Sequence, residues 1–225
     1  MSTRAIFICA GEATRWDSYL GVEKHYAPIE GEPIIERAVR LFKAEGIKDI
    51  FVVSRDYCIE GVTNYRPTLD ERNYDADKFL SSHELWNTQG RTIIVYGDVY
   101  FTEQAVKTIV HDKSKQWKLF CRPWQSEITG TEWGECFAVS LYPAQHKKAL
   151  RKLRFLIWLF EQKIAWRIGG WEWARMMHGV LAGEVNEHIE QSHTYIVIDD
   201  MTDDLDYPED YDRLIVAIRN NPIPA

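Results

Sequence analysis

Short apolar segments that end at glycine or at charged residues recur along the chain and alternate with stretches of helical periodicity. The first of them, Ala5–Ala10, is uninterrupted and runs directly into Gly11. A run of this kind is typical of a strand that is covered on both faces, as in a parallel sheet. By the same criterion we predict strands over residues 5–10, 49–54, 92–96, 117–122, 136–141 and 194–198.

Helices are predicted between these strands from apolar residues that repeat every three or four positions. Pro33 stands where one helix begins and Gly46 where it ends, because proline tolerates the first turn and glycine the left-handed C-terminal position. One long stripe consists of Leu150, Leu153, Ile157, Phe160, Ile164 and Ile168. The predicted helices cover 33–45, 77–86, 102–110, 144–168, 171–181 and 208–219, and residues 56–75 are expected to be irregular. This alternation predicts a single Rossmann-like α/β domain over residues 1–225, in which helices sandwich a mostly parallel sheet.

The overall charge and the cysteine spacing narrow the classes of partner. The chain has 34 acidic and 27 basic side chains, a net charge of −7, which disfavours a general nucleic-acid binder. Its four cysteines are widely separated and form no zinc motif, as expected for reduced thiols in a cytoplasm. The longest apolar run, Phe155–Phe160, is far below the roughly 20 residues that a membrane span needs. We therefore expect a cytoplasmic protein with neither nucleic acid nor membrane as its partner.

The loop after the first predicted strand has the composition of a phosphate-binding loop. Its small residues from Ala10 onward let backbone N–H groups approach an anion closely. Arg15 adds a planar fork suited to phosphate oxygens, and Lys24 adds a point charge. Two cations near one strand end suit a triphosphate, although a surface loop with two solvated cations would show the same pattern.

Three segments near the N-terminus carry a family pattern. AGEATRW, EKHYAPIEGEPIIERAV and KDIFVV follow one another within residues 4–54, and in order and spacing they resemble the signature of the sugar nucleotidyltransferase superfamily, including its molybdenum-cofactor guanylyltransferase-like and cytidylyltransferase-like branches. Ala13 replaces the second glycine of that signature, and Glu23 replaces the proline before its lysine. The resemblance implies a GT-A-like form of the fold and catalytic roles for Arg15 and Lys24. The nucleotide-binding residues that it implies are Ala10, Gly11, Glu12, Ala13, Thr14 and Arg15.

Two acidic features resemble the metal ligands of the same superfamily. Asp98 follows the third predicted strand, and the resemblance makes it a ligand of the catalytic Mg²⁺; alternatively it caps the helix that begins near Thr102. The segment Asp199–Leu214 (DDMTDDLDYPEDYDRL) resembles the superfamily's closing segment, which implies Asp206 as the second Mg²⁺ ligand. A solvated acidic loop is the alternative. The other candidate ligands there are Asp199, Asp200, Asp203 and Asp204.

The second half of the chain offers weaker signals. Glu135 resembles the position at which the superfamily contacts its acceptor, or it is simply a turn residue. Tryptophans of this region are interpreted mainly as core or subunit contacts, with a box for a choline-like cation as the alternative; they are Trp133, Trp158, Trp166, Trp171 and Trp173. The basic run 146–154 is interpreted as a solvated helix face. The stripe over 150–168 and the number of tryptophans favour a homodimer.

The resemblance implies an Mg²⁺-dependent nucleotidyltransferase that transfers NMP from an NTP to a phosphorylated small molecule, such as a sugar 1-phosphate, with release of pyrophosphate. Residues 1–112 would form the nucleotide-binding half, and residues 113–225 the acceptor-binding half with the closing helix. Two alternatives are a GT-A glycosyltransferase that uses a nucleotide sugar and a non-catalytic nucleotide-binding module.

Overall fold

A seven-stranded sheet runs through the centre of the molecule in the order β10-β8-β9-β6-β1-β4-β5. The computed structural model describes residues 2–221 except 12, 56–57, 68–78, 131, 133, 166 and 180–194. The strands of the sheet are β1 (Thr3–Ile8), β4 (Asp49–Val53), β5 (Thr63–Tyr65), β6 (Arg91–Tyr96), β8 (Lys118–Arg122), β9 (Glu135–Leu141) and β10 (Tyr195–Val197). Strand β9 is antiparallel to both of its neighbours, and the remaining pairs are parallel. The prediction of an α/β fold with a mostly parallel sheet is confirmed.

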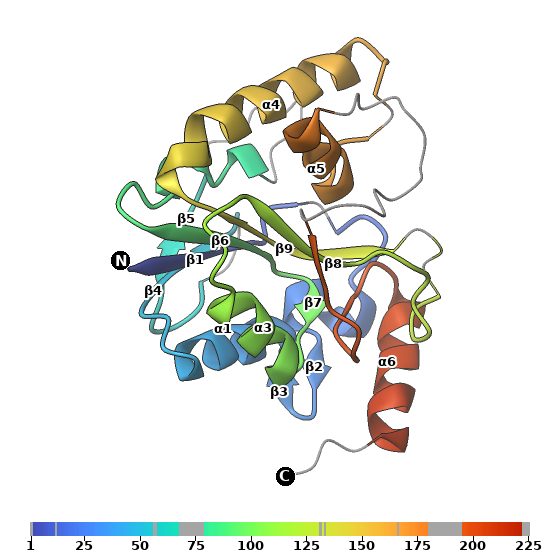
Figure 1. The fold of residues 1–225 in the computed structure, drawn as a ribbon. Helices are drawn as coiled ribbons and strands as arrows, with labels where there is room; N and C mark the ends of the chain where they lie inside the picture. Colours follow the sequence, from blue (N-terminus) through green and yellow to red (C-terminus); the bar gives the residue numbers. More distant parts are fainter. Residues whose placement is uncertain are drawn as a thin grey trace.

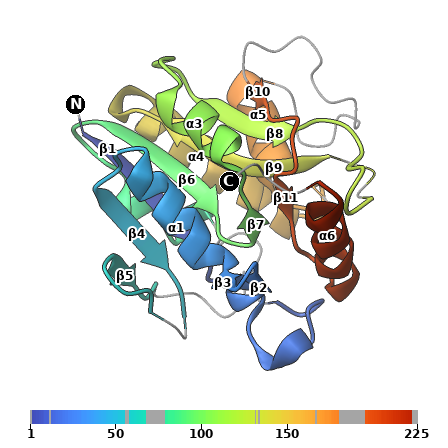
Figure 2. The ribbon, with the colours of Figure 1, turned by 90° about the horizontal axis from the view of Figure 1, so that it is seen from below.

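Helices cover both faces of this sheet (Figures 1 and 2). Helices α1 (Ile34–Ala44) and α3 (Glu103–His111) lie on one face, and α4 (Pro143–Glu161) and α5 (Gly170–His178) lie on the other. The central strand β1 contributes side chains to the hydrophobic core on both faces of the sheet, because alternate side chains of a strand point to opposite faces. Ile6 packs into the α4/α5 layer and Phe7 into the α1/α3 layer, and both are fully buried.

A third hydrophobic cluster joins the ends of the chain. Helix α6 (Pro208–Asn220) buries Leu214 and Ile218 against Trp16, Ile29 and neighbouring side chains from the N-terminal segment. Short strands β2 (Pro28–Ile29) and β3 (Glu32–Pro33) form a hairpin in the same region. This cluster brings the segment before α6 next to the loop after β1, as expected for segments that follow strands at the same edge of the sheet.

Several predicted boundaries were wrong. The strand β5 lies in the stretch 56–75 that was expected to be irregular. Pro33 is the N-cap of α1 rather than its first residue. The helix predicted over 144–168 ends at Glu161, and Lys163 in the following turn has a left-handed φ of 59°. The helix predicted over 77–86 begins at residues outside those described, and its last part contains the 3-10 helix η3 (His83–Leu85). Two further predicted boundaries lie outside the described residues: residue 194, where the last strand was predicted to begin, and residues 180–181, where the helix from 171 was predicted to end.

The apolar stripe that favoured a homodimer belongs largely to the protein's own core. Leu153, Ile157 and Ile168 are buried in the layer between the sheet and α4/α5, while Ile164 is exposed. Trp171 and Trp173 are buried there too, which confirms them as core; Trp158 is exposed, and Trp133 and Trp166 lie outside the described residues. Homodimerisation and the division at residues 112/113 stay predictions. Within the described ranges, none of the helices has the length and apolar character to cross a membrane.

Candidate active site

The loop after β1 is held in place by a buried tryptophan. Ala10 is buried at the end of β1, and Trp16 donates from its indole Nε1 to the carbonyl oxygen of Val22 at 2.9 Å. Because Trp16 anchors the loop into the third cluster, its neighbours Thr14 and Arg15 remain exposed. Glu12 lies outside the described residues. The loop therefore presents Arg15 at the carboxyl edge of the sheet, where ligands bind in open α/β folds.

Lys24 lies in a 3-10 turn, η2 (Lys24–Tyr26), and its buried ammonium joins two acidic residues. Its Nζ is 2.5 Å from Asp98 Oδ2 and 3.4 Å from Asp206 Oδ1. Burial by itself lowers the pKa of Lys24, but the attraction of Asp98, and then of Asp206, outweighs it and raises the pKa above its ordinary value. Lys24 is thus held as a cation, and Glu23 beside it is exposed.

Asp98 sits in a tight connection between β6 and the short strand β7 (Val99–Tyr100). Gly97 packs so closely against the end of β1 that a Cβ there would meet Cys9 Sγ at 2.1 Å, so only glycine fits. The alternative role of Asp98 as a helix cap is wrong. Thr102 is the N-cap of α3, and its Oγ1 accepts from the backbone N–H of Ala105 at 3.0 Å.

The C-terminal acidic segment reaches Asp98 through backbone pairing. Strand β11 (Asp203–Asp204) is antiparallel to β7, and the N–H of Leu205 donates to the carbonyl oxygen of Asp98 at 3.0 Å. Asp206 follows at once and forms ion pairs with Arg15 and Lys24. The guanidinium of Arg15 also lies over the ring of Tyr207, 5.3 Å from its centroid. Of the five candidate aspartates, Asp206 is the one paired with both predicted cations.

Two of the remaining aspartates have structural partners. Asp203 is fully buried and forms an ion pair with Arg122 at 3.2 Å. Asp200 accepts from Thr102 Oγ1 at 2.6 Å and from the backbone N–H of Thr202 at 2.8 Å. These contacts fix the segment against β8 and the start of α3. Asp200 and Asp203 thus have structural roles that require no bound ligand.

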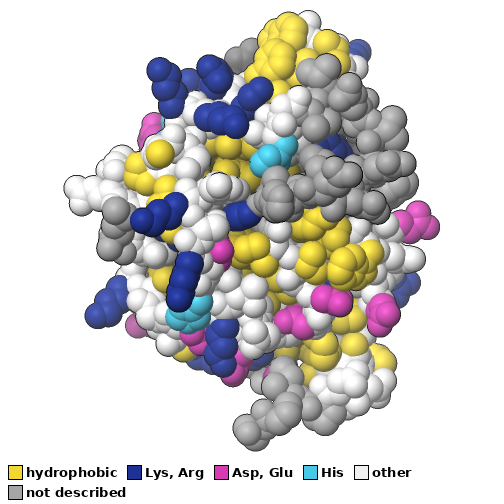
Figure 3. All heavy atoms as spheres, in the orientation of Figure 1, with side chains coloured by type: hydrophobic (Ala, Val, Ile, Leu, Met, Phe, Trp, Pro, Cys, Tyr) yellow, Lys and Arg dark blue, Asp and Glu magenta, His cyan; other side chains and the backbone are white. Residues whose placement is uncertain are grey.

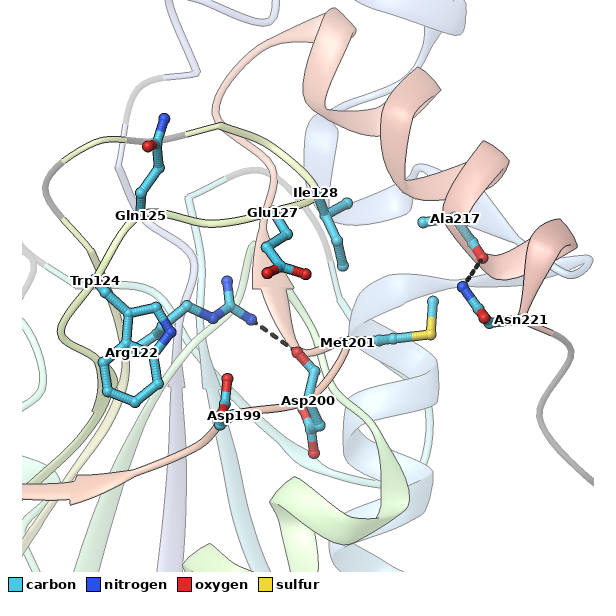
Figure 4. Close-up of a pocket in the computed structure, with 10 residues that line it drawn as sticks. All are labelled: Arg122, Trp124, Gln125, Glu127, Ile128, Asp199, Asp200, Met201, Ala217 and Asn221. Carbon is cyan, nitrogen blue, oxygen red and sulfur yellow. Dashed lines mark hydrogen bonds between the residues drawn. The ribbon is translucent and has the colours of Figure 1, made fainter.

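Asp199 and Asp200 line a different pocket, of about 440 Å³ (Figure 4). Arg122 crosses it and donates from its guanidinium to the carbonyl oxygen of Asp200 at 2.8 Å. Asp199 is exposed on its wall. The two residues line this pocket and not the one that contains Asp98 and Asp206.

The remaining acidic residues of the predicted site lie on the wall of one pocket, of about 120 Å³, which Arg15 also lines. Asp204 and Glu135 face it together with Asp98 and Asp206. The pKa of Asp204 is raised well above its ordinary range, first by burial and then by the negative charges of Glu135, Asp206 and Asp98. Glu135 thus lines the same pocket as the acidic cluster, and its role toward the acceptor stays a prediction.

Sequence reasoning missed the opposite wall of this pocket. Residues at the start of α5 and in the turn before it contribute Arg167, Ile168, Gly169, Gly170 and Trp171, and β6 contributes Tyr96. At Gly170 a Cβ would meet Tyr96 Oη at 2.7 Å, which explains the glycine. The Gly169-Gly170 pair, which lies between the helices predicted over 144–168 and 171–181, was a usable signal for this wall.

Several solved structures share the fold of this protein over nearly the whole chain. A putative glucose-1-phosphate thymidylyltransferase from Bacillus anthracis aligns with a TM-score of 0.63 and 14% identity, over 100% of this chain and 98% of that one. CTP:phosphocholine cytidylyltransferase from Streptococcus pneumoniae aligns with a TM-score of 0.56 and 15% identity, over 97% and 100%. Inositol-1-phosphate CTP transferase from T. maritima gives 0.53 and 13%, over 100% and 98%. No family model and no curated protein matches the sequence.

The chain has a sugar nucleotidyltransferase-like fold. Within this sugar nucleotidyltransferase-like fold, four predicted site residues from three distant segments meet: Arg15, Lys24, Asp98 and Asp206. Glu135 lines the same pocket, and Ala10 and Gly11 lie at the end of β1. The convergence is a finding of the structure, and the chemical roles of these residues stay predictions.

Proposed function

We propose that this protein transfers NMP from an NTP to a phosphorylated small molecule and releases pyrophosphate. The observation that carries the proposal is the ion-paired cluster in which Lys24 joins Asp98 and Asp206 while Arg15 joins Asp206. The three neighbours named above, one of them putative, are nucleotidyltransferases whose names specify glucose 1-phosphate, phosphocholine and inositol 1-phosphate as acceptors. Their shared fold supports the same reaction class for this chain.

In the proposed reaction an oxygen of the acceptor phosphate attacks the α-phosphorus of the NTP. A new P–O bond forms between acceptor and nucleotide, the bond from the α-phosphorus to the α,β-bridging oxygen breaks, and the electron pair leaves with pyrophosphate. No proton transfer is needed, because the attacking phosphate oxygen is already anionic. Catalysis of this kind rests on positioning and on charge stabilisation rather than on covalent help from side chains.

Arg15 and Lys24 would supply this charge stabilisation. Both lie at the carboxyl edge of the sheet, and Lys24 is buried, so its attraction to phosphate oxygens is weakly screened. The raised pKa of Lys24 keeps it protonated throughout the neutral range. Arg15 is exposed and can pair with phosphate through its planar fork. We assign both to the triphosphate, and the backbone at Ala10 and Gly11 to the nucleoside.

The chemistry of the pocket also fits a magnesium ion. Asp98 and Asp206 both contact the Lys24 ammonium, so their carboxylates converge on one point. Within the described residues, no three His, Cys, Asp or Glu side chains are grouped to hold a metal by themselves. This matches Mg²⁺, which usually binds one or two carboxylates and completes its shell with water and phosphate oxygens. Bound by Asp98 and Asp206, Mg²⁺ would neutralise phosphate charge.

Glu135 is assigned to the acceptor. It lies at the start of β9 after Gly134, on the wall of the pocket that continues toward Arg167. Its carboxylate would accept hydrogen bonds from acceptor hydroxyl groups. The tight turn at Gly134 fixes this position, because the φ of Gly134 is 70° and a Cβ there would lie 2.3 Å from the carbonyl oxygen of Arg122, so that only glycine fits.

The test is pyrophosphate release with Mg²⁺ from each of the four common NTPs, paired with glucose 1-phosphate, inositol 1-phosphate and phosphocholine. We expect release that needs both substrates and that falls at least about 100-fold in Asp98→Ala, the scale of losing one electrostatic contact to the transition state. Asp199→Ala is the matched control, because this exposed aspartate lies on the second pocket, and it should keep wild-type rates.

Release that survives Asp98→Ala would reject the role assigned to Asp98. Two further outcomes would reject the proposed reaction itself. NDP release from a nucleotide sugar, without pyrophosphate from any NTP, would make the protein a glycosyltransferase. NTP binding by calorimetry without turnover on any acceptor would make it a nucleotide-binding module.

A further inference from the structure

The outward face of α4 carries large apolar side chains that the fold does not use. Phe155 is 41% exposed and Trp158 is 48% exposed, and their rings stack with centroids 5.6 Å apart and planes 11° apart. Ile164, in the turn just after the helix, is 57% exposed. The core side of the same helix is filled by other residues, including Leu153 and Leu156. These three exposed side chains are therefore available to a partner.

The same face is strongly basic. Helix α4 contains five lysines and arginines and a single acidic residue, in a chain whose net charge is −7. Lys147, Lys148, Arg151 and Arg154 are exposed, and they precede Phe155 and Trp158 at helical spacing. Figure 3 shows basic side chains gathered along the lower left part of α4 and hydrophobic ones at its upper end. We call these six residues, with Ile164, the α4 outer face.

We propose that the α4 outer face binds the surface of an anionic lipid bilayer. The cations match the negative potential of acidic phospholipid headgroups, which attracts Lys and Arg beside the membrane. Phe155, Trp158 and Ile164 supply the apolar part that enters the boundary between headgroups and acyl chains, a depth at which tryptophan is favoured. A helix that lies in the plane of the surface needs no long apolar run. The proposal thus revises the expectation of no membrane partner, which rested on run length.

Charge and apolarity together favour a bilayer over two other occupants. A two-fold interface would place the same face of a second copy here, and because none of the seven residues of this face is acidic, its cations would meet no opposite charge across the contact. A nucleic acid would match the cations but offers no apolar phase for Ile164, which is the most exposed of the three apolar side chains. A bilayer surface offers anionic headgroups to the cations and an apolar phase to Phe155, Trp158 and Ile164.

The docked face would lie next to the candidate active site. The turn after α4 continues from Ile164 to Arg167 and Ile168, and both of these line the pocket that contains Asp98 and Asp206. Binding through the α4 outer face would hold this side of the pocket near the lipid surface. The proposal itself does not depend on the reaction catalysed there.

The test is co-sedimentation of the full chain with vesicles of phosphatidylcholine that contain 30% phosphatidylserine, compared with pure phosphatidylcholine vesicles. We expect binding only to the anionic vesicles, weakened by salt. Arg151→Glu/Arg154→Glu should lower the partition coefficient by more than about 25-fold, since each lost cation contributes about fivefold. Phe155→Ser/Trp158→Ser should lower it as well, while remaining folded, because both side chains are exposed.

The matched control is Lys48→Glu/Lys107→Glu, which changes the net charge by the same amount. Both lysines are exposed, and Lys107 lies on α3, in the layer opposite α4. This variant should bind anionic vesicles within about twofold of wild type. Unfolding temperatures within about 3 °C of wild type would show that all three variants are folded.

Each other result would overturn the proposal. Equal binding of the control and the Arg151/Arg154 variant would show a non-specific charge effect. No vesicle binding, together with a dimer in sedimentation velocity that Phe155→Ser/Trp158→Ser abolishes, would assign the face to a second copy. No vesicle binding together with binding to a single-stranded RNA, lost in the Arg151/Arg154 variant, would assign it to nucleic acid. No binding to any of them would make it a solvated face.

Discussion

The buried ion pair between Arg122 and Asp203 gives the sharpest prediction for stability. Asp203 is fully buried, and its carboxylate faces Arg122 at 3.2 Å. It also accepts from the hydroxyl of Ser126, from Thr129 Oγ1 at 3.3 Å and from the backbone N–H of Asp204 at 3.1 Å. The substitution Asp203→Asn keeps the shape but removes the charge and turns one acceptor into a donor.

The expected cost follows from what remains buried. Removing one partner of a buried ion pair typically costs about 3–5 kcal/mol, because the other charge is left uncompensated. Arg122 keeps its bonds to the carbonyl oxygens of Asp200 and Thr202, so it stays in place rather than turning to solvent. We expect a loss of about 3–5 kcal/mol of unfolding free energy, which for a chain of this size lowers Tm by roughly 6–20 °C.

Urea unfolding followed by tryptophan fluorescence measures this loss, since several tryptophans are buried in the core. Asp199→Asn is the matched control: it is close in sequence, carries the same change, and is exposed, so it should cost less than about 0.5 kcal/mol. If Asp203→Asn lies within about 1 kcal/mol of the control, the pair does not hold the C-terminal segment, and the account of how Asp206 is positioned fails.

Three further predictions concern single residues. Lys24→Met should lower pyrophosphate release by about 10²–10³-fold. Because the pKa of Lys24 is raised in the folded protein, its charge is complete below about pH 10 and is lost only as the pH rises through that pKa. A wild-type rate that falls between pH 7 and 9, with a fall that Lys24→Met removes, would contradict the placement of Lys24. Gly134→Ala should destabilise the protein by at least about 2 kcal/mol more than Gly21→Ala in thermal unfolding. Both glycines have a positive φ, but only at position 134 would the new Cβ collide with a backbone oxygen. Equal losses of stability in the two variants would argue against the tight turn at Gly134. Thr102→Ala should cost about 1–2 kcal/mol in urea unfolding through loss of the α3 cap, and a neutral result would show that the cap is dispensable.

The sequence predicted the layers of this fold because buried strands and amphipathic helices have distinct periods. Strand β1 and helix α1 were recognised within two residues of their ends. The strand β5 was missed because its residues are polar and either exposed or half-buried, as an edge strand allows. The pairing of β7 with β11 was missed because each strand is only two residues long. Periodicity carries no signal at that length.

The candidate site was predictable where chemistry and strand ends coincide. Asp98 and the loop to Lys24 follow buried strands directly, so the topology placed them together. The family resemblance singled out Asp206 among the C-terminal aspartates, but strand ends alone do not, because it is burial and partners that separate Asp203, held by Arg122, from Asp206, held by Arg15 and Lys24. The opposite wall around Arg167 follows a turn whose direction depends on the packing of α4 and α5 against the sheet.

The most direct test of the central claim is to follow the phosphorus atoms of a complete reaction by ³¹P NMR, with Mg²⁺, an NTP and a phosphorylated acceptor. We predict that the resonances of the NTP and the acceptor decrease together, while one equivalent each of pyrophosphate and of a new diphosphate diester increases, and that Asp98→Asn abolishes both changes. Formation of NDP or orthophosphate without the diester, or diester formation that Asp98→Asn leaves intact, would contradict the proposed transfer.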